Sequence, residues 1–296
     1  MGISLISFSK KASDLFYETN NLEKIATGFF FTEGPVWDEF QDILYFTNFS
    51  DNTIHQWSEK TGTLLYRQNA NRAVGLSMDS AGRIVSAETR THAITYVNET
   101  DSETIMDTYK GKRLNSPNDV VVKRDGDIFF TDPYSTAMGD VRELPFNGVF
   151  KVTPGSNAVL LSDSLERPNG LAFSPDETIL YVDDTNQQNI TAYQVHEDDT
   201  LGRIGVFATL DPSYGKGAAD GMKVDVLGNV YLTGPGGIWI FDKDASPLAI
   251  LETPESAGNL CFGGQDRSTL FIAATSSIYW IHLKIPGIVP RRSESK

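Results

Sequence analysis

The stretch that decides the fold is Asn169-Gly170-Leu171-Ala172-Phe173-Ser174-Pro175-Asp176-Glu177-Thr178-Ile179-Leu180-Tyr181-Val182-Asp183-Asp184. Its first part alternates large apolar and small residues, and its last part is a β-rich apolar run, so both parts predict strands. The Ser-Pro-Asp-Glu segment between them is typical of a turn, because proline presets φ and the Ser and Asp side chains bond nearby backbone groups. The stretch therefore predicts two short strands joined by a tight turn.

The same two-strand unit recurs along the whole chain. The six copies begin at residues 33, 74, 118, 169, 220 and 258, so successive copies are 41, 44, 51, 51 and 38 residues apart. A repeat of about 45 residues with strand patterning is the length of one propeller blade of four strands. A β-sandwich or a parallel β-helix does not predict a four-strand period. We therefore predict an all-β, six-bladed β-propeller with four-stranded antiparallel blades.

The copies also predict the domain boundaries. Residues 21–288 should form a single catalytic propeller domain, preceded by a flexible or short helical lead-in at 1–20 and followed by a flexible tail at 289–296. Residues 22–32 read as a strand before the first copy. Such a strand can complete the last blade and close the ring, which removes exposed sheet edges.

Composition limits the classes of partner. The formal net charge of −14 argues against nucleic acid and anionic membranes, because binding phosphates needs clustered Lys and Arg. The single cysteine, Cys261, lies in an apolar stretch and is expected to be a buried core thiol. The first ten residues lack the long apolar segment of a secretory signal, and no run is long enough for a membrane helix, so we expect a cytoplasmic protein. The oligomeric state stays open.

The repeat converts sequence positions into spatial ones, because equivalent positions of all blades lie on a ring around one axis. The first position of each copy gives a first ring of Glu33, Val74, Asn118, Asn169, Asp220 and Gly258. The last position of each copy gives a last ring of Asn48, Glu88, Asp132, Asp184, Gly234 and Ala274. Each ring holds four oxygen-bearing side chains, and buried carboxylates are costly unless they are paired or bind a metal.

The oxygen-bearing members of the first ring predict a metal site. Glu33, Asn118, Asn169 and Asp220 would offer two carboxylates and two amide oxygens to one point, a donor set that suits hard cations. Ca²⁺ is the first choice, with Mg²⁺, Mn²⁺ or Zn²⁺ as alternatives. The four histidines share no ring and no ligand spacing, so a histidine zinc site is not expected. The competing interpretation is a hydrogen-bonded polar plug or a line of waters in the channel.

Five motifs resemble one known family. They are Phe31-Thr32-Glu33-Gly34-Pro35-Val36-Trp37, Asn115-Ser116-Pro117-Asn118-Asp119-Val120, Phe130-Thr131-Asp132-Pro133, Arg167-Pro168-Asn169-Gly170-Leu171 and Ala219-Asp220-Gly221-Met222. Together, over about residues 25–285, the chain resembles the gluconolactonase/regucalcin (senescence-marker-protein) family of six-bladed propellers. The resemblance implies one catalytic divalent metal at Glu33, Asn118, Asn169 and Asp220, and hydrolysis of sugar lactones. Relatives such as paraoxonase and squid-type diisopropylfluorophosphatase act on aryl lactones or organophosphates.

Two positions depart from this family. Bacterial gluconolactonase-like members often carry Glu-His where this chain has Glu88-Thr89, and Asp where it has Asn48. Both positions lie near the predicted pocket, so they leave the substrate open. The main hypothesis is a metal-dependent lactonase. The alternatives are an organophosphate or phosphotriester hydrolase on the same metal site, and a non-enzymatic calcium-binding propeller.

The site implies roles for individual residues. A bound metal would polarise the lactone carbonyl, with Asp220 as general base or, as an alternative, nucleophile. Asp132 and Asp184 are candidates for a proton relay, or else cap strand ends. Arg113 is expected to bind a substrate hydroxyl or carboxylate, or to lie on the surface. We predict a substrate-binding set of Arg113, Glu88, Asp132 and Tyr134, with Met138 beside it if the insertion at 133–147 covers the channel mouth. A second insertion at 210–219 has the same two interpretations, a cover over the mouth or a surface loop.

Overall fold

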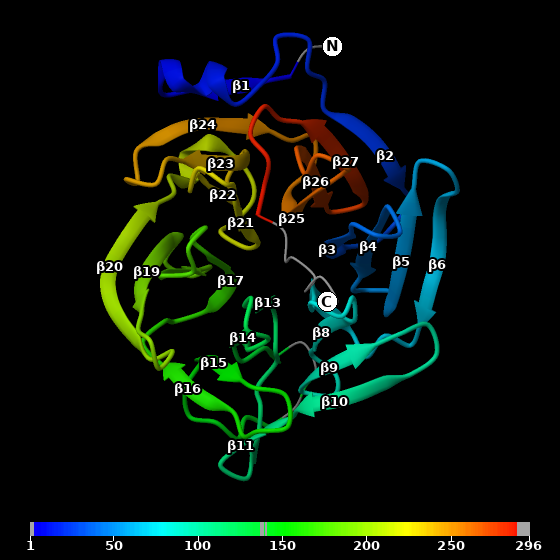
Figure 1. Ribbon diagram of the computed structural model, residues 1–296, viewed down its shortest axis with the longest axis vertical. Helices are drawn as coiled ribbons and strands as arrows, with labels where there is room; N and C mark the ends of the chain where they lie inside the picture. The colour runs from blue at the N-terminus through cyan, green and yellow to red at the C-terminus, as the bar shows by residue number, and fades with distance from the viewer. Residues whose placement is uncertain (1–2, 137–138, 140, 289–296) are drawn as a thin grey trace, which may run out of the picture.

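Six four-stranded antiparallel sheets stand around a central axis in the computed structural model, which describes residues 3–136, 139 and 141–288 (Figure 1). The innermost strands surround the axis and the outermost ones form the perimeter. The predicted six-bladed all-β propeller is confirmed. In each blade, the two strands of the predicted copy are the innermost strand and its neighbour.

The blades follow one another in chain order. Blade 1 contains β3 (Thr32–Asp38), β4 (Ile43–Asn48), β5 (Thr53–Ser58) and β6 (Gly62–Gln68), and blade 2 contains β7 (Ala73–Met78), β8 (Ile84–Glu88), β9 (Ala93–Val97) and β10 (Ser102–Met106). Blade 3 contains β13 (Val120–Val122), β14 (Ile128–Asp132), β15 (Gly148–Val152) and β16 (Val159–Ser162), and blade 4 contains β17 (Pro168–Phe173), β18 (Ile179–Asp184), β19 (Asn189–Val195) and β20 (Leu201–Thr209). Blade 5 contains β21 (Met222–Val224), β22 (Val230–Gly234), β23 (Gly237–Phe241) and β24 (Pro247–Glu252), and blade 6 contains β25 (Ala257–Gly263), β26 (Thr269–Ala274) and β27 (Ser277–His282). A ribbon of β11 (Thr108–Tyr109) and β12 (Lys112–Arg113) precedes blade 3.

The N-terminal strand closes the ring, as the sequence predicts. β2 (Glu23–Thr27) pairs with β27 and becomes the fourth strand of blade 6, with Thr27 opposite Ser277. This strand ends at residue 27, earlier than the predicted 22–32, and β3 begins at Thr32. Joining the first and last parts of the chain in one sheet leaves no gap between blades 1 and 6.

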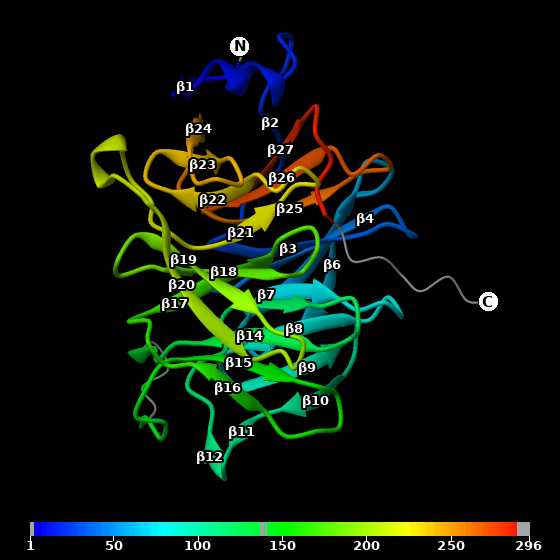
Figure 2. The same ribbon diagram turned by 60° about the vertical axis from the view of Figure 1, so that its left-hand side comes forward.

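The lead-in is more ordered than the sequence indicates. β1 (Leu5–Ser7) pairs with β24 and adds a fifth strand to blade 5, at the outer edge seen in Figure 2. A 3₁₀ helix at Lys10–Asp14 follows, and the nearby side chains of Leu15 and Phe16 are buried. The predicted tail at 289–296 and Met138 lie outside the described residues.

The hydrophobic core is divided among the blade interfaces. Six clusters of buried side chains are described, and each combines residues from two adjacent blades. Between blades 6 and 1, the Trp37 ring stacks on Phe271 with centroids 5.2 Å apart. Cys261 belongs to this cluster, and burial raises the pKa of its thiol to about 12, which confirms a core thiol. Because stability is spread over repeated interfaces, the polar channel can be altered without removing the core.

Candidate metal centre in the central channel

Hydrogen bonds between blades place the first ring at one end of the channel. The N–H of Gly75 donates to the carbonyl of Asn118, and Gly170 donates to Asp220, both at 2.8 Å. Gly221 donates in the same way to Gly258, also at 2.8 Å. In these three bonds, the second residue of one copy binds the first residue of the next copy. Equivalent positions in sequence are therefore equivalent in space, as the ring argument requires.

Four blades bring the predicted metal ligands to this ring. Glu33 is only 2% exposed and Asn169 is 6% exposed, whereas Asn118 and Asp220 are half-buried. The N–H of Gly34 donates to Glu33 Oε2 at 3.0 Å and fixes that carboxylate. Asn169 Nδ2 donates to Thr185 Oγ1 at 3.0 Å, so the amide oxygen remains available as a ligand.

The two carboxyl groups of the ring disfavour each other's charge. Burial raises the pKa of Glu33 to about 7, although the Gly34 N–H opposes the shift. Burial also raises the pKa of Asp220 well above its usual range, and the Glu33 charge adds to this rise. A hard divalent cation would remove both penalties, because it replaces lost hydration and neutralises two negative charges. The donor set therefore fits the cation that the sequence predicts.

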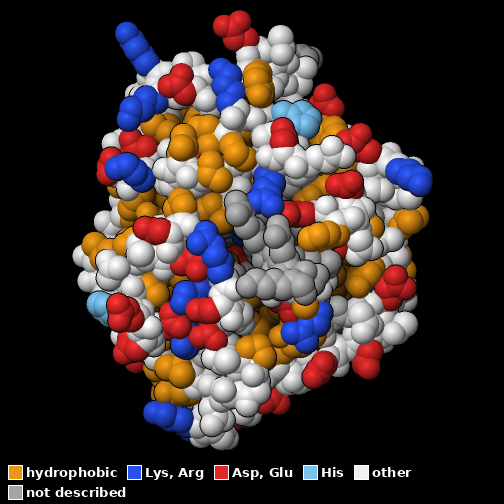
Figure 3. Space-filling view, viewed as in Figure 1, with side chains coloured by type: hydrophobic (Ala, Val, Ile, Leu, Met, Phe, Trp, Pro, Cys, Tyr) orange, Lys and Arg blue, Asp and Glu red, His pale blue; other side chains and the backbone are white. Residues whose placement is uncertain are grey.

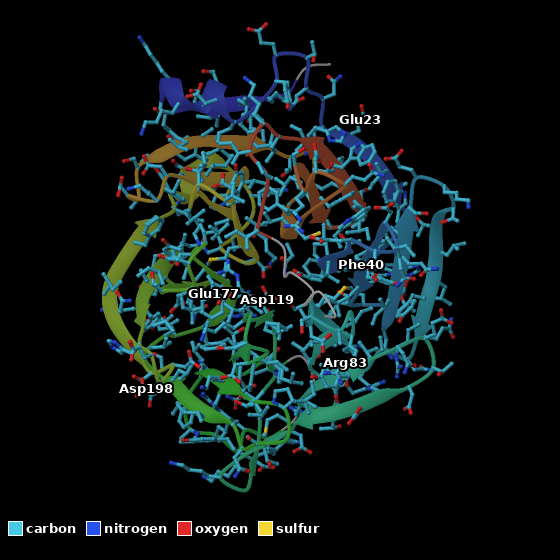
Figure 4. All side chains as sticks on the ribbon, in the orientation of Figure 1. Glu23, Phe40, Arg83, Asp119, Glu177 and Asp198 are labelled. Atoms are coloured by element: carbon cyan, nitrogen blue, oxygen red, sulfur yellow. The ribbon has the colours of Figure 1, made fainter. Side chains whose placement is uncertain are left out.

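A second polar layer beneath the ring was not anticipated from the sequence. Asp119 and Asp183 are 2% and 0% exposed, and Figure 4 labels Asp119 close to the axis. One carboxylate oxygen of Asp119 and both of Asp183 have no hydrogen-bond partner among the described residues. The second residues of the copies could have indicated part of this layer. Four of them are glycine, whereas blades 3 and 6 carry Asp119 and Asn259.

A lysine supplies positive charge to this layer. Burial raises the pKa of Glu33, Asp119 and Cys261, and the Lys223 ammonium opposes all three shifts. Because these groups come from blades 1, 3 and 6, the ammonium must lie near the axis. Its Nζ donates to the carbonyl of Met222 at 2.8 Å.

Asp183 occupies a position that threonine holds in other blades. Thr47, Thr131 and Thr233 donate their hydroxyls to first-ring carbonyls of the next blade at 3.0, 2.7 and 3.2 Å. Burial and the Asp220 charge raise the pKa of Asp183 well above its usual range, which favours its neutral carboxyl form. A protonated carboxyl has an O–H donor, as threonine does. Asp183 can therefore make the equivalent bond to the Asp220 carbonyl.

The last ring anchors the segments that lead into the inner strands. Asp132 accepts N–H bonds from Asn115 and Ser116, both at 2.8 Å, and Asp184 accepts N–H bonds from residues 166 and 167 at 2.7 and 3.2 Å. Asn48 Oδ1 accepts the N–H groups of residues 30 and 31 at 3.3 and 3.2 Å. This geometry gives these side chains a positioning role.

Glu88 is held in the same way within blade 2. Its carboxylate accepts bonds from Asn71 Nδ2 at 2.9 Å and from the hydroxyls of Thr91 and Thr95 at 2.5 and 2.9 Å. The contact of Glu88 and Asp132 with substrate stays a prediction.

Arg113 is engaged with the insertion at 133–147. Its Nη2 donates to the Val141 carbonyl at 2.9 Å, and its Nε lies 3.8 Å from Glu143 Oε1. Tyr134 also contacts residues of this insertion. Its N–H donates to Asn147 Oδ1 at 2.9 Å, and its ring centroid lies 5.2 Å from the Arg142 guanidinium. Arg113 therefore positions the insertion, and substrate binding by Arg113 and Tyr134 stays a prediction. In the other insertion, the Tyr214 ring contacts Trp239 at 5.2 Å, so this part packs against blade 5.

Another acidic cluster lies where blades 3 and 4 meet, with Asp125 exposed and Asp199 buried. Ligand atoms of Asp125, Asp127 and Asp199 lie within 4.8 Å of one another. Lys123 and Lys151 bridge to Asp199 at 2.6 and 3.0 Å, so two ammonium groups already balance the cluster. Figure 3 shows acidic and basic side chains interleaved at the lower left of this face, where these blades lie. We regard this cluster as an ion-pair network between blades.

The fold and the site together define a class of protein. It is the six-bladed propeller with a ring of oxygen donors at one end of its channel. Residues 31–276 match the family described as the SMP-30/Gluconolactonase/LRE-like region, and the chain belongs to this family. The predicted resemblance is confirmed.

Relatives match over almost the whole chain. A gluconolactonase of Zymomonas mobilis is 30% identical, over 96% of this chain and 87% of the relative. A solved structure of a putative gluconolactonase has a TM-score of 0.90 at 26% identity, covering 96% of this chain and 99% of that one. The gluconolactonase of Xanthomonas campestris has a TM-score of 0.87 at 30% identity, covering 94% of each chain. Within the described residues, no helix is long and apolar enough to cross a membrane.

Proposed function

We propose that this protein is a lactonase that uses a divalent cation, Ca²⁺ first, held by Glu33, Asn118, Asn169 and Asp220. The observation that carries the proposal is that two carboxylates and two amides hold equivalent inner positions in four blades, where burial raises the pKa of both carboxyl groups. The gluconolactonase relatives support a lactone as the substrate over a phosphotriester.

The charges of the channel are consistent with one divalent ion. Glu33, Asp119, Asp183 and Asp220 bring four carboxyl groups, and burial raises the pKa of each. One divalent cation and the Lys223 ammonium would balance three ionised carboxylates and leave the fourth carboxyl neutral. A second divalent ion would leave an excess of positive charge in a buried channel, which is costly.

We assign different steps of the hydrolysis to the cation and to the residues of the ring. When bound, the cation polarises the lactone carbonyl and stabilises the negative charge that develops on its oxygen. Asp220 is half-buried, whereas Glu33 is 2% exposed and its carboxylate accepts the Gly34 N–H. We therefore assign proton transfer to Asp220. It takes a proton from water, the water oxygen attacks the carbonyl carbon, the ring C–O bond breaks, and the proton passes to the leaving ring oxygen.

Metal removal tests the proposal. We expect a chelator to abolish hydrolysis of glucono-δ-lactone, and Ca²⁺ or another hard divalent ion to restore it. Calorimetry should show one ion per chain. Full activity in excess chelator, together with no bound ion in the purified protein, would reject the proposed function.

A further inference from the structure

Two arginines occupy equivalent positions at the entrance to the metal ring. Arg72 and Arg167 each precede a first-ring residue by two positions, in blades 2 and 4. Their carbonyls accept equivalent bonds, from the N–H of Thr89 at 3.2 Å and of Thr185 at 3.1 Å. The two arginines therefore enter the channel region from equivalent backbone positions in blades 2 and 4.

Their surroundings leave both charges available. Arg167 is exposed, and its charge is close enough to Asp220 to oppose the rise in pKa that burial causes there. The Arg72 guanidinium lies 5.4 Å from the Phe49 ring centroid. Within the described part of the chain, neither arginine forms an ion pair.

A third arginine lies between them, on blade 3. Arg142 is exposed, donates to Asn147 Oδ1 at 2.8 Å, and lies against the Tyr134 ring. Burial raises the pKa of Asp132 to about 7, and the Arg142 charge opposes this rise, so Arg142 also lies near the channel. Blade 1 has apolar side chains in the equivalent segment, just before Glu33. These are Phe30, which is 69% exposed, and Phe31, which is 36% exposed.

The acidic side chains of the last ring bond to other groups, and none of them forms an ion pair with these arginines within the described residues. Asp132 and Asp184 accept backbone N–H groups, and Glu88 accepts hydroxyls and an amide. Blades 2 to 4 thus bring three guanidinium groups to these segments in a chain whose net charge is −14. Guanidinium groups bind phosphate and carboxylate through paired, charge-assisted hydrogen bonds, and charge at a mouth steers anions into it.

We propose that Arg72, Arg142 and Arg167 bind an anionic group, and that the preferred substrate is a sugar lactone carrying a phosphate or carboxylate remote from its ring carbonyl. This inference rests on the proposed lactonase function. The anion would lie over blades 2 to 4 while the lactone carbonyl faces the first ring. The departures at Asn48 and Thr89, which lie at the end of the channel that bears these arginines, agree with a substrate other than a neutral sugar lactone.

The test compares glucono-δ-lactone with its 6-phosphate and its 6-carboxylate analogue. For the parent, we expect kcat/KM to be at least about tenfold higher for one anionic lactone, since hydrogen bonds between charged groups are stronger than those between neutral ones. The preference should fall about tenfold in Arg167→Gln and Arg72→Gln, mainly through KM, and further in the double variant. Arg203→Gln, an exposed arginine on the outer strand β20, removes the same charge and should leave the preference unchanged.

Binding of the product 6-phosphogluconate, measured by calorimetry, gives a readout independent of turnover. Its affinity should fall with added salt and in the Arg72 and Arg167 variants, but not in Arg203→Gln. Equal or better hydrolysis of the neutral lactone, with a preference unchanged in the double variant, would overturn the inference and leave the lactonase function standing. Failure to hydrolyse any of the three lactones in the presence of Ca²⁺ would instead reject the proposed function.

Discussion

The N–H of Gly170 donates a 2.8 Å hydrogen bond to the carbonyl oxygen of Asp220, which joins blade 4 to blade 5 at the metal ring. A Cβ added at Gly170 would lie only 2.1 Å from that oxygen. The close contact of the two blades therefore requires glycine. It also links the position of the proposed base directly to its neighbour in the ring.

We expect Gly170→Ala to destabilise the protein and displace Asp220. Overpacking at a tight contact costs about 1–3 kcal/mol or more. Thermal unfolding should show the loss, and calorimetry should show weaker Ca²⁺ binding. Gly155→Ala is the matched control, because nothing lies within 4 Å of its Cβ position and only its φ of +86° is strained. An alanine at 170 that leaves both stability and Ca²⁺ affinity unchanged would contradict the blade contact.

The two amide ligands should affect the ion more than the fold. Asn118→Ala and Asn169→Ala each remove one oxygen from the proposed set, while the six hydrophobic clusters between blades remain. We expect at least about tenfold weaker Ca²⁺ binding and a melting temperature close to that of the metal-free parent. Global unfolding of either variant would show instead that these side chains are a structural plug.

Asp183 should be replaceable by threonine. Thr47, Thr131 and Thr233 donate to first-ring carbonyls at the equivalent positions. Asp183→Thr keeps a hydrogen-bond donor. Asp183→Val places a side chain of nearly the same shape as threonine there, but without a donor. We expect the threonine variant to be more stable than the valine variant by about 1 kcal/mol, the net contribution of a hydrogen bond. Equal unfolding free energies for the two variants would show that a donor at position 183 makes no such bond.

The metal-free protein should lose stability as pH rises. Burial raises the pKa of Glu33 and of Asp132 to about 7. Between their ordinary values and about 7, the folded state binds more protons than the unfolded state, so the free energy of unfolding falls with increasing pH. Saturating Ca²⁺ should oppose this fall, because the ion binds the ionised carboxylates and its binding strengthens as protons leave.

Melting temperatures measured from pH 5 to pH 8, with chelator and with Ca²⁺, check this sign. Stability of the chelated protein that increases across this range would contradict the buried, uncompensated state of the carboxyl groups.

The repeat allowed the fold to be predicted, and blade periodicity placed Glu33 and Asp220 at equivalent positions around the axis despite their distance in sequence. The strand β1 was missed because three residues, Leu5–Ser7, carry little local signal and pair with distant Leu251, Ile250 and Ala249. The role of Lys223 was not predicted, because the sequence does not show where the ammonium at the end of a long side chain will lie. The role of Asp183 depends on its resemblance to threonine when protonated, which its sequence neighbourhood does not reveal.

The central claim is that Asp220 both holds the ion and accepts the proton from water. Asp220→Asn keeps one oxygen ligand and removes most of the basicity, so its rate on the best lactone, measured at Ca²⁺ saturation verified by calorimetry, tests the claim most directly. We predict a folded protein that still binds Ca²⁺ and is slower by about 10²–10⁴-fold, the usual contribution of a general base. Activity within about threefold of the parent at saturation would contradict the claim and show that another group acts as the general base.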